Sequence, residues 1–396
     1  MKRLAALALL AACGGPSRPI TPPVAMTIKP LGDVETPDLA RPANSDEPEM
    51  PVQIALSTNR LCARVDGRVY CRSQVNLDPP LVQDKLRMSG VDDAIDISGS
   101  GGLLCVATRR GTVLCSGSNE YGELGAQSKE DRSDTFVEVT GVSHAKRVSA
   151  GRNHACATLD DRRVQCWGKN ENGQTGSDTF YQAPARELVR ASLVPNVKSD
   201  NAVAGGESTC ARTPERHVVC WGFQQDREQA MKTGHGQNER PTRMPELDDI
   251  SALTGHDEGY CAVRRGHVLC WGNARRLIPG TDYFGSGIVS VAEIKDAQHV
   301  ALADAHGCIL HTDGRVSCFG YPYTYALGRA GPSDPQKQYE AQPPEVVEGL
   351  PRARFVAVGG MQSCALTYGN DLYCWGRWYT DAGTHDEVKS IAIQLR

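Results

Sequence analysis

The sequence predicts an all-β fold, a seven-bladed β-propeller of four-stranded antiparallel blades, and three observations carry this prediction. Fourteen of the fifteen cysteines form seven close pairs, whose first members lie 43 to 56 residues apart. Each pair brackets a short turn between apolar residues, and Trp-Gly follows the second cysteine in four of the seven repeats. A period near 50 residues, built from short strands and glycine-rich turns, is typical of propeller blades.

The turn inside each cysteine pair predicts a β-hairpin. Asp66-Gly67 and Arg265-Gly266 stand midway between their cysteines, and Asp-Gly between alternating apolar residues is a strong signal for a two-residue turn. The other five pairs are one residue longer, which suits a three-residue loop whose third residue is left-handed. That third position falls on Gly111, Arg162, Arg216, Gly314 and Asn370.

The N-terminus predicts export. Lys2 and Arg3 precede an apolar run from Leu4 to Leu10, and Ala11-Ala12-Cys13 offers a small-residue cleavage site. The run ending in Cys13 resembles the lipobox of bacterial lipoproteins, which implies cleavage before Cys13 and lipid attachment to its thiol. An ordinary secretory signal with an incidental cysteine is the alternative.

Three segments follow from this pattern. Residues 1–12 are expected to be the lipoprotein signal peptide. Residues 13–51 are expected to be the lipid anchor and a proline-rich spacer, because residues 14–51 hold nine of the 23 prolines and no aromatic residue. Residues 52–396 are expected to form the propeller. No later stretch approaches the ~20 apolar residues of a spanning helix, so lipid is the expected membrane contact.

Either hairpin length leaves the two cysteines of a pair directly opposite each other, with Cα atoms ~4.5 Å apart, which is close enough for a disulfide. Export to an oxidising compartment favours bridges over reduced core cysteines. No Cys-x-x-Cys occurs, so structural zinc is a poor interpretation. We expect one disulfide in each blade: Cys62–Cys71, Cys105–Cys115, Cys156–Cys166, Cys210–Cys220, Cys261–Cys270, Cys308–Cys318 and Cys364–Cys374.

The repeated tryptophans are expected to be core residues. Trp167, Trp221, Trp271 and Trp375 occupy the same position in their repeats, directly after the second cysteine. A catalytic or ligand-binding role does not need the same aromatic side chain in most blades. Packing between neighbouring sheets does, because a large flat ring fills the gap between them.

These residues resemble the regulator of chromosome condensation repeat, whose pattern joins His-x-Cys-Ala-Leu to Trp-Gly-x-Asn-x-x-Gly-x-Leu-Gly. The stretch His154-Ala155-Cys156-Ala157 followed by Trp167-Gly168-Lys169-Asn170 matches it, and the likeness recurs over residues 52–396. Repeats one and six depart from it, with Arg72 and Phe319 at the Trp position. The resemblance implies a seven-bladed propeller, and the second cysteine of each pair resembles an exported bacterial branch of the family.

The resemblance does not carry the best-known activities of the family, nucleotide exchange on a nuclear GTPase and nucleosome binding. An exported protein does not meet a cytosolic GTPase. A net charge of −4 and a pI near 6.2 argue against nucleic-acid binding. The sequence lacks the common hydrolase, metalloprotease, phosphate-binding and calcium motifs, so we expect neither an enzyme nor a metal or other cofactor. His154 and His306 match a structural position of the repeat and are expected to be hydrogen-bonded rather than metal ligands.

The hairpin turns should all lie on one rim of the disc, and they are rich in arginine. The segments between the paired cysteines contain eleven arginines and six acidic residues. We call the following eight arginines the basic rim, a candidate surface for an acidic protein or an acidic envelope glycan: Arg109, Arg110, Arg162, Arg163, Arg216, Arg264, Arg265 and Arg315. The alternative is that arginine merely suits solvated turns.

A second candidate surface is the set of long connections between blades at residues 223–248 and 321–352, which exceed what a four-stranded blade needs. Loops on a rigid scaffold commonly carry recognition. Tyr321, Tyr323 and Tyr325 would face one way on an extended segment there, and packing within the sixth blade is an equal alternative.

Together these observations predict an outer-membrane lipoprotein of the cell envelope, monomeric, that binds a protein or a glycan. Its partner would be an envelope protein or an acidic glycan. The alternatives are an enzyme inhibitor, which would bind one protein tightly, and a propeller hydrolase acting on an extracellular polymer. Ring closure is left open: Ile391-Ala392-Ile393 would complete the seventh blade or pair with the first near Val52 to Leu56.

Overall fold

The computed structural model describes residues 52–58, 60–73, 87–177, 189–223, 237–257, 259–281, 287–322, 325–329, 337–369, 371–380 and 383–386. The signal peptide, Cys13 and the spacer predicted from the sequence lie outside these residues. Within the described ranges, no helix is long and apolar enough to cross a membrane.

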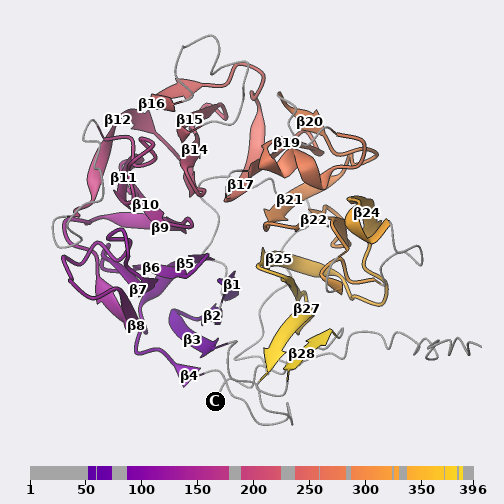
Figure 1. The fold of residues 1–396 in the computed structure, drawn as a ribbon, viewed down its shortest axis with the longest axis horizontal. Helices are drawn as coiled ribbons and strands as arrows, with labels where there is room; N and C mark the ends of the chain where they lie inside the picture. Colours follow the sequence, from indigo (N-terminus) through magenta and orange to yellow (C-terminus); the bar gives the residue numbers. More distant parts are fainter. Residues whose placement is uncertain are drawn as a thin grey trace, which may run out of the picture.

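The chain forms seven four-stranded sheets, and in each sheet four consecutive strands pair antiparallel from the axis outward. Figure 1 shows the sheets following one another around a central axis in chain order. The predicted all-β propeller is therefore confirmed. The strands of blades 1 to 4 are β1 (Val52–Leu56), β2 (Arg60–Val65), β3 (Arg68–Ser73), β4 (Arg87–Met88); β5 (Ala94–Ser100), β6 (Leu103–Thr108), β7 (Val113–Ser118), β8 (Arg132–Glu138); β9 (Ala145–Ala150), β10 (His154–Leu159), β11 (Arg163–Gly168), β12 (Ser192–Lys198); and β13 (Asn201–Ala204), β14 (Ser208–Arg212), β15 (Val218–Phe223), β16 (Gln237–Arg243). Those of blades 5 to 7 are β17 (Ile250–His256), β18 (Gly259–Arg264), β19 (His267–Gly272), β20 (Val289–Ser290); β21 (Ala297–Leu302), β22 (His306–His311), β23 (Val316–Gly320), β24 (Gln342–Val346); and β25 (Ala353–Gly359), β26 (Gln362–Thr367), β27 (Leu372–Thr380), β28 (Gly383–Asp386). Two short 3₁₀ helices, η2 (Asn273–Leu277) and η4 (Lys337–Tyr339), lie in connections.

The hairpins between second and third strands adopt the predicted turns. Asp66 and Gly67 have φ angles of 47° and 81°, and Arg265 and Gly266 have 50° and 82°, so both residues of each two-residue turn are left-handed. In the longer loops the predicted third residue is also left-handed, even where it is arginine, as at Arg162 (φ 68°) and Arg216 (φ 65°). Asn370 lies outside the described residues.

The cysteines of each pair stand directly opposite each other in the second and third strands. All seven predicted disulfides are present, one in each blade, with Cα atoms 4.0 to 4.2 Å apart. Each bridge therefore joins the two middle strands of its sheet.

Between blades, the core consists of seven apolar clusters, each formed by two neighbouring blades. The four repeated tryptophans belong to these clusters and are at most 4% exposed, which confirms their core role. Phe319 takes the same place in blade 6 and is fully buried.

The ring closes by packing rather than by a shared strand. Blade 7 is completed by β28, and blade 1 uses β1 as its own innermost strand. Val52, Ile54 and Leu56 of blade 1 form one cluster with Leu366 and Leu372 of blade 7. Residues 391–393, which we considered for closure, lie outside the described residues.

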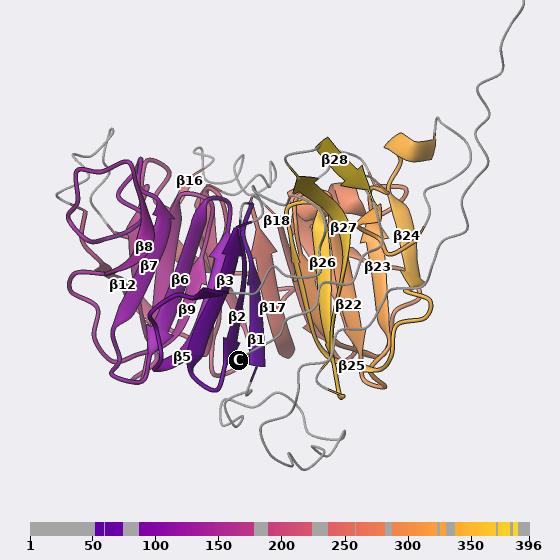
Figure 2. The same cartoon turned by 90° about the horizontal axis from the view of Figure 1, so that it is seen from below.

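Because all blades share one strand order, the disc has two distinct faces. The hairpin face carries the turns at 66–67, 109–112, 160–162, 213–217, 265–266 and 312–315, with the connections from each blade to the next. The loop face carries the inner turns at 101–102, 151–153, 205–207, 303–305 and 360–361, with the connections at 119–131, 169–177 and 273–281. In Figure 2 the loop face is the upper edge, where β28 lies.

Two expectations about the long connections need correction. The segments 223–248 and 321–352 are not surplus to the blades, because they contain the outermost strands β16 and β24. The tyrosines after β23 do not share an extended segment, since Tyr325 is left-handed, with a φ of 58°. Tyr323 lies outside the described residues.

Candidate binding surfaces

On the hairpin face, backbone hydrogen bonds connect each blade to the next. A carbonyl of each hairpin turn accepts the N–H at the start of the next blade, at 2.7 to 2.9 Å, in six successive blade pairs. The acceptors, from blade 1 to blade 6, are Gly67, Gly111, Arg162, Arg216, Gly266 and Gly314. The turn that exposes the arginines therefore also fixes where the following connection ends.

The structure places the eight arginines of the basic rim on this face and gives six of them a carboxylate partner. Their ion pairs are Arg110–Asp93, Arg162–Asp200, Arg163–Asp161, Arg216–Asp249, Arg265–Asp249, Arg315–Asp296 and Arg315–Asp313. Arg264 donates instead to the carbonyl of Glu246 at 2.9 Å, and the backbone N–H of Arg109 donates to the backbone carbonyl of Asp93 at 2.7 Å.

Most of the carboxylate partners occupy one repeat position that the sequence analysis missed. Asp93, Asp200, Asp249 and Asp296 each stand immediately before the innermost strand of a blade. Asp249 forms two ion pairs, one with Arg216 of blade 4 (Nη2 to Oδ1, 3.1 Å) and one with Arg265 of its own blade (Nε to Oδ2, 2.8 Å). The recurrence of Asp directly before an inner strand was the signal that could have revealed them.

Two of the paired carboxyls, Asp249 and Asp313, have lowered pKa values. The Arg265 hydrogen bond, followed by the charge of Arg216, holds the pKa of Asp249 below its ordinary value. The backbone N–H of Arg315, with its guanidinium, lowers the pKa of Asp313 to about 2. The hairpin face is therefore a ring of alternating charges, and its arginine charge is largely compensated within the protein.

The loop face surrounds a small cavity of about 170 Å³ at the mouth of the central channel. Arg152 of blade 3 reaches Asp257 of blade 5, with Nη1 and Oδ1 3.2 Å apart. His256 lies 2.9 Å from Asp304 of blade 6, measured from Nδ1 to Oδ1, and this contact lowers the pKa of the Asp304 carboxyl. Inner turns of different blades thus converge on one charged opening.

Large exposed apolar side chains are few, and two of the four in the described part belong to the loop face. Tyr339 in η4 is 74% exposed, and Met361 in an inner turn of blade 7 is 38% exposed. The other two, Leu193 and Val346, lie on the outer strands β12 and β24. The loop face is therefore the disc face with the more apolar features.

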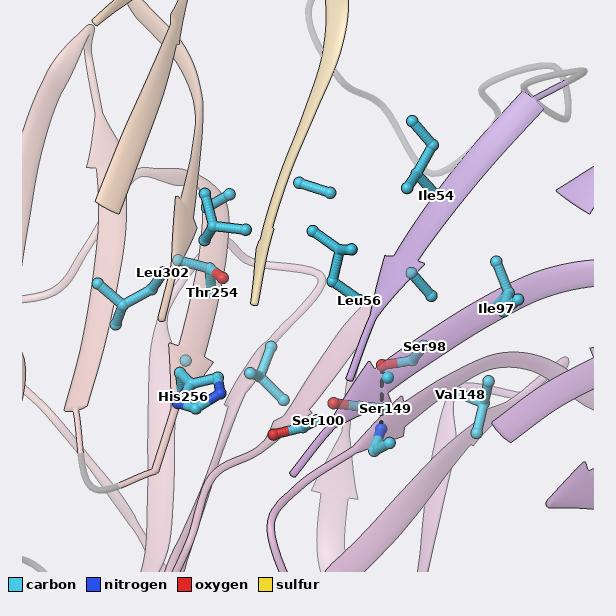
Figure 3. A pocket seen from close by; sticks show the side chains of 18 of the residues that line it. Ile54, Leu56, Ile97, Ser98, Ser100, Val148, Ser149, Thr254, His256 and Leu302 are labelled. Atoms are coloured by element: carbon cyan, nitrogen blue, oxygen red, sulfur yellow. Dashed lines mark hydrogen bonds between the residues drawn. The ribbon is translucent and has the colours of Figure 1, made fainter. Parts of the chain in front are cut away.

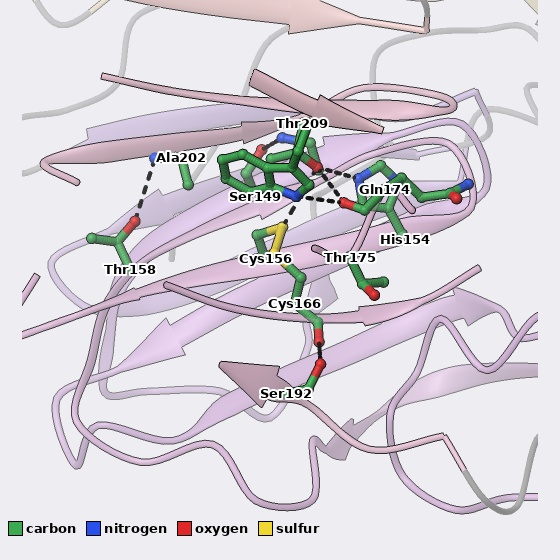
Figure 4. The surroundings of a disulfide bond; sticks show 12 residues. Ser149, His154, Cys156, Thr158, Cys166, Gln174, Thr175, Ser192, Ala202 and Thr209 are labelled. Atoms are coloured by element: carbon green, nitrogen blue, oxygen red, sulfur yellow. Dashed lines mark hydrogen bonds between the residues drawn. A yellow bond between two sulfur atoms is a disulfide. The ribbon is translucent and has the colours of Figure 1, made fainter. Parts of the chain in front are cut away.

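The two histidines expected to be structural are buried links between blades. In Figure 4, His154 of blade 3 meets Thr209 of blade 4 beside the Cys156–Cys166 disulfide. The Thr209 hydroxyl donates to the carbonyl of Gln174 at 2.8 Å, so His154 Nε2–H donates to Thr209 Oγ1 at 2.8 Å. Burial lowers the pKa of His154 to about 3, which leaves the ring neutral.

Blade 6 repeats this arrangement. His306 Nε2 lies 2.8 Å from Ser363 Oγ, Ser363 donates to the carbonyl of Ala326, and Trp375 donates to the same carbonyl, both at 2.9 Å. Burial lowers the pKa of His306 to about 4. Both histidines are thus hydrogen-bonded as expected, and among the described residues no cluster of His, Cys, Asp or Glu has the composition of a metal site.

Comparison with known proteins gives a consistent picture. Residues 145–174 match the family model described as the regulator of chromosome condensation (RCC1) repeat. The Drosophila melanogaster regulator of chromosome condensation is 28% identical over 319 residues, which cover 73% of this chain and 55% of the fly protein. The human E3 ubiquitin-protein ligase HERC2 is 24% identical over 306 residues, which cover 72% of this chain and 6% of that ligase. The chain thus spans about half of the first relative and a small part of the second.

Solved structures share the fold. Prp20p from Saccharomyces cerevisiae superposes with a TM-score of 0.63 at 16% identity, covering 84% of this chain and 83% of Prp20p. Human WBSCR16 also gives a TM-score of 0.63 at 16% identity, covering 79% and 86%. These findings show that the chain is a seven-bladed propeller with a regulator of chromosome condensation repeat at residues 145–174, and that it is similar to proteins of that family over most of its length.

Proposed function

We propose that this chain is a protein-binding scaffold of the cell envelope, held by a lipid on Cys13 and spaced from the membrane by residues 14–51. The observation that carries the proposal is the contrast between the two faces. The loop face carries a charged opening at its centre and exposes Met361, next to Gly360 of that opening, and Tyr339, in the connection to the outermost strand of blade 6. The arginines of the hairpin face are instead largely paired within the chain.

Exposed aromatic and methionine side chains on a rigid support are typical of protein interfaces. The seven disulfides and the seven inter-blade clusters provide that support. Prp20p, which shares the fold, was characterised for its binding to Gsp1p and histones, and its binding of proteins supports the same class of function here. We infer binding rather than catalysis, because the sequence carries no recognised catalytic motif.

Capture from detergent-solubilised envelope by the immobilised full chain tests the binding site. The variant Tyr339→Ser with Met361→Gln is compared with a control in which Arg110 and Arg163 are changed to Ala on the hairpin face. We expect one stoichiometric protein to be retained at high salt by the wild type and the control and lost by the loop-face variant. Capture only of an acidic glycan, lost at high salt and in the arginine variant, would refute the loop-face proposal and favour the basic rim.

Lipid attachment has its own test. Cells expressing the full chain are fed an alkyne-labelled fatty acid, and the chain should become labelled and partition with membranes. Cys13→Ser should abolish both, while Cys71→Ser, a change in a blade, should keep the label. Labelling that persists in Cys13→Ser would contradict the anchor.

A further inference from the structure

The axis of the propeller encloses a cavity of about 240 Å³, lined by the innermost strands of all seven blades. Figure 3 shows side chains from several of these strands pointing into the same space. His256 lines both this channel and the opening on the loop face. The channel therefore adjoins a surface opening.

The walls of the channel combine apolar and hydroxyl-bearing side chains. Ile54, Leu56, Ile97 and Leu302 supply apolar surface, and Ser98, Ser100, Ser149 and Thr254 supply hydroxyls (Figure 3). Apolar walls with a few convergent polar groups are typical of small-molecule sites. The volume lies below the ~300–1,000 Å³ of pockets for drug-sized ligands, so the occupant would be smaller.

Two of the hydroxyls are oriented by the scaffold. Ser98 Oγ accepts the N–H of Ala150, and Ser149 Oγ accepts the N–H of Ala204, both at 3.0 Å. Each oxygen therefore has an N–H on one side, and its own O–H proton is left to donate elsewhere. These hydrogen bonds join neighbouring inner strands, so the positions of both hydroxyls are fixed before any ligand enters.

Ser100 is the least satisfied of these groups. It is the last residue of β5, it lines the channel and it is 6% exposed, yet its Oγ has no hydrogen-bond partner in the described part of the protein. A buried hydroxyl without a partner is unfavourable, and native structures rarely keep one without a bound water or ligand. Ser100 thus points to an occupant at this level of the channel.

The channel wall carries two charged groups of opposite sign, Asp96 and Arg147. Asp96 accepts hydrogen bonds from Gln53 Nε2 and from the N–H of Val148, both at 2.9 Å. Burial raises the pKa of the Asp96 carboxyl above its ordinary value, and the charge of Arg147 and these hydrogen bonds offset part of that rise. His299 also lines the channel, and burial lowers its pKa to about 4, which leaves it neutral. The opposite charges of Asp96 and Arg147 therefore offset each other in part, which favours a neutral ligand over a charged one.

We propose that the central channel binds a small neutral polyhydroxylated molecule of monosaccharide size. The hydroxyls of Ser98, Ser100 and Ser149 hydrogen-bond the ligand, and the apolar side chains contact its C–H faces. This inference goes beyond the proposed protein-binding function and does not depend on it.

Calorimetric titration of the purified full chain with defined probes tests the site. The probes are D-glucose, N-acetyl-D-glucosamine and myo-inositol, with D-glucuronate and inorganic phosphate as charged counterparts. We expect at least one neutral probe to bind and the charged probes not to bind. Binding of the charged probes alone, or of none of the five, would overturn the proposal and leave ordered water as the channel occupant.

Ser100→Ala separates a binding role from a structural one. Because the hydroxyl has no partner within the described protein, its removal should leave the urea midpoint of the free protein unchanged or higher. Binding of the neutral probe should weaken about tenfold, as expected for one lost hydrogen bond. Ser133→Ala, on the exposed outer strand β8, is the matched control and should bind as the wild type does. Equal affinity in Ser100→Ala and the wild type would overturn the assignment.

Discussion

Replacing Thr209 by valine should weaken the junction between blades 3 and 4. The Thr209 hydroxyl is fully buried, accepts from His154 Nε2 and donates to the carbonyl of Gln174, both at 2.8 Å. Valine keeps the branched shape and removes both bonds. The Gln174 carbonyl still accepts a hydrogen bond from Trp221 Nε1 at 2.9 Å, so the group that loses its partner is the His154 Nε2–H. Two hydrogen bonds at ~1 kcal/mol each, with the cost of a buried unpaired donor, give a loss of about 2–4 kcal/mol in the free energy of unfolding.

Urea unfolding of the oxidised protein, followed by tryptophan fluorescence and circular dichroism, measures this loss. Thr135→Val, on the exposed strand β8, is the control and should change stability by less than about 0.5 kcal/mol. The stranded donor is tested in a His154→Asn background, where Thr209→Val should cost less than in the wild type. Equal costs in the two backgrounds, or a loss no larger than that of the control, would refute the assignment of this hydrogen-bonded link.

Three further predictions concern stability. Burial lowers the pKa of His154 to about 3 and those of His299 and His306 to about 4, below the ordinary 6.5. Below about pH 6.5 these histidines are protonated in the unfolded chain but stay neutral in the folded chain. The free energy of unfolding should therefore be constant above about pH 6.5 and fall toward pH 4 by up to ~1.4 kcal/mol per pH unit for each histidine. A His154→Gln variant in which this slope is unchanged would contradict the prediction. Gly266→Ala should cost more than Gly141→Ala in urea unfolding, because both are left-handed (φ 82° and 85°) but only at Gly266 would a Cβ meet a carbonyl, that of Lys295 at 2.1 Å. Graded reduction with mass-spectrometric mapping should open the Cys62–Cys71 bridge first, since Cys71 alone among the paired cysteines is only partly buried; earlier reduction of a bridge in another blade would count against it.

The hairpins and disulfides could be predicted from the sequence because they depend on local geometry. The number of residues between two cysteines determines the turn, and the turn sets which residues stand opposite each other. This reasoning held even for Arg162 and Arg216, which adopt left-handed angles that side chains rarely take. The spacing of the cysteines was therefore enough to predict both the number of blades and the pairing of the cysteines in disulfides.

The partners of the turn arginines could not be predicted in the same way. The arginines were placed on the correct face, but Arg162 and Arg216 pair with an aspartate that precedes the next blade. Arg110, Arg265 and Arg315 pair with the aspartate that precedes the inner strand of their own blade, 16 to 19 residues away in the sequence. A net charge counted over the hairpins alone therefore overstated how basic the face is.

The channel hydroxyls were not anticipated for a related reason. Ser98, Ser100 and Ser149 occupy ordinary strand positions, and a two-residue period does not reveal which side of a strand faces the axis. Their shared location depends on seven strands converging, which no single repeat encodes.

Site-specific photocrosslinking tests the proposed function of the loop face most directly. A benzophenone amino acid is placed at Tyr339 on the loop face or at Arg163 on the hairpin face of the full chain in its native envelope, and both positions are exposed. We predict a discrete adduct with one protein from position 339 and none from position 163. Adducts from position 163 alone would contradict the account and return recognition to the arginine-bearing face.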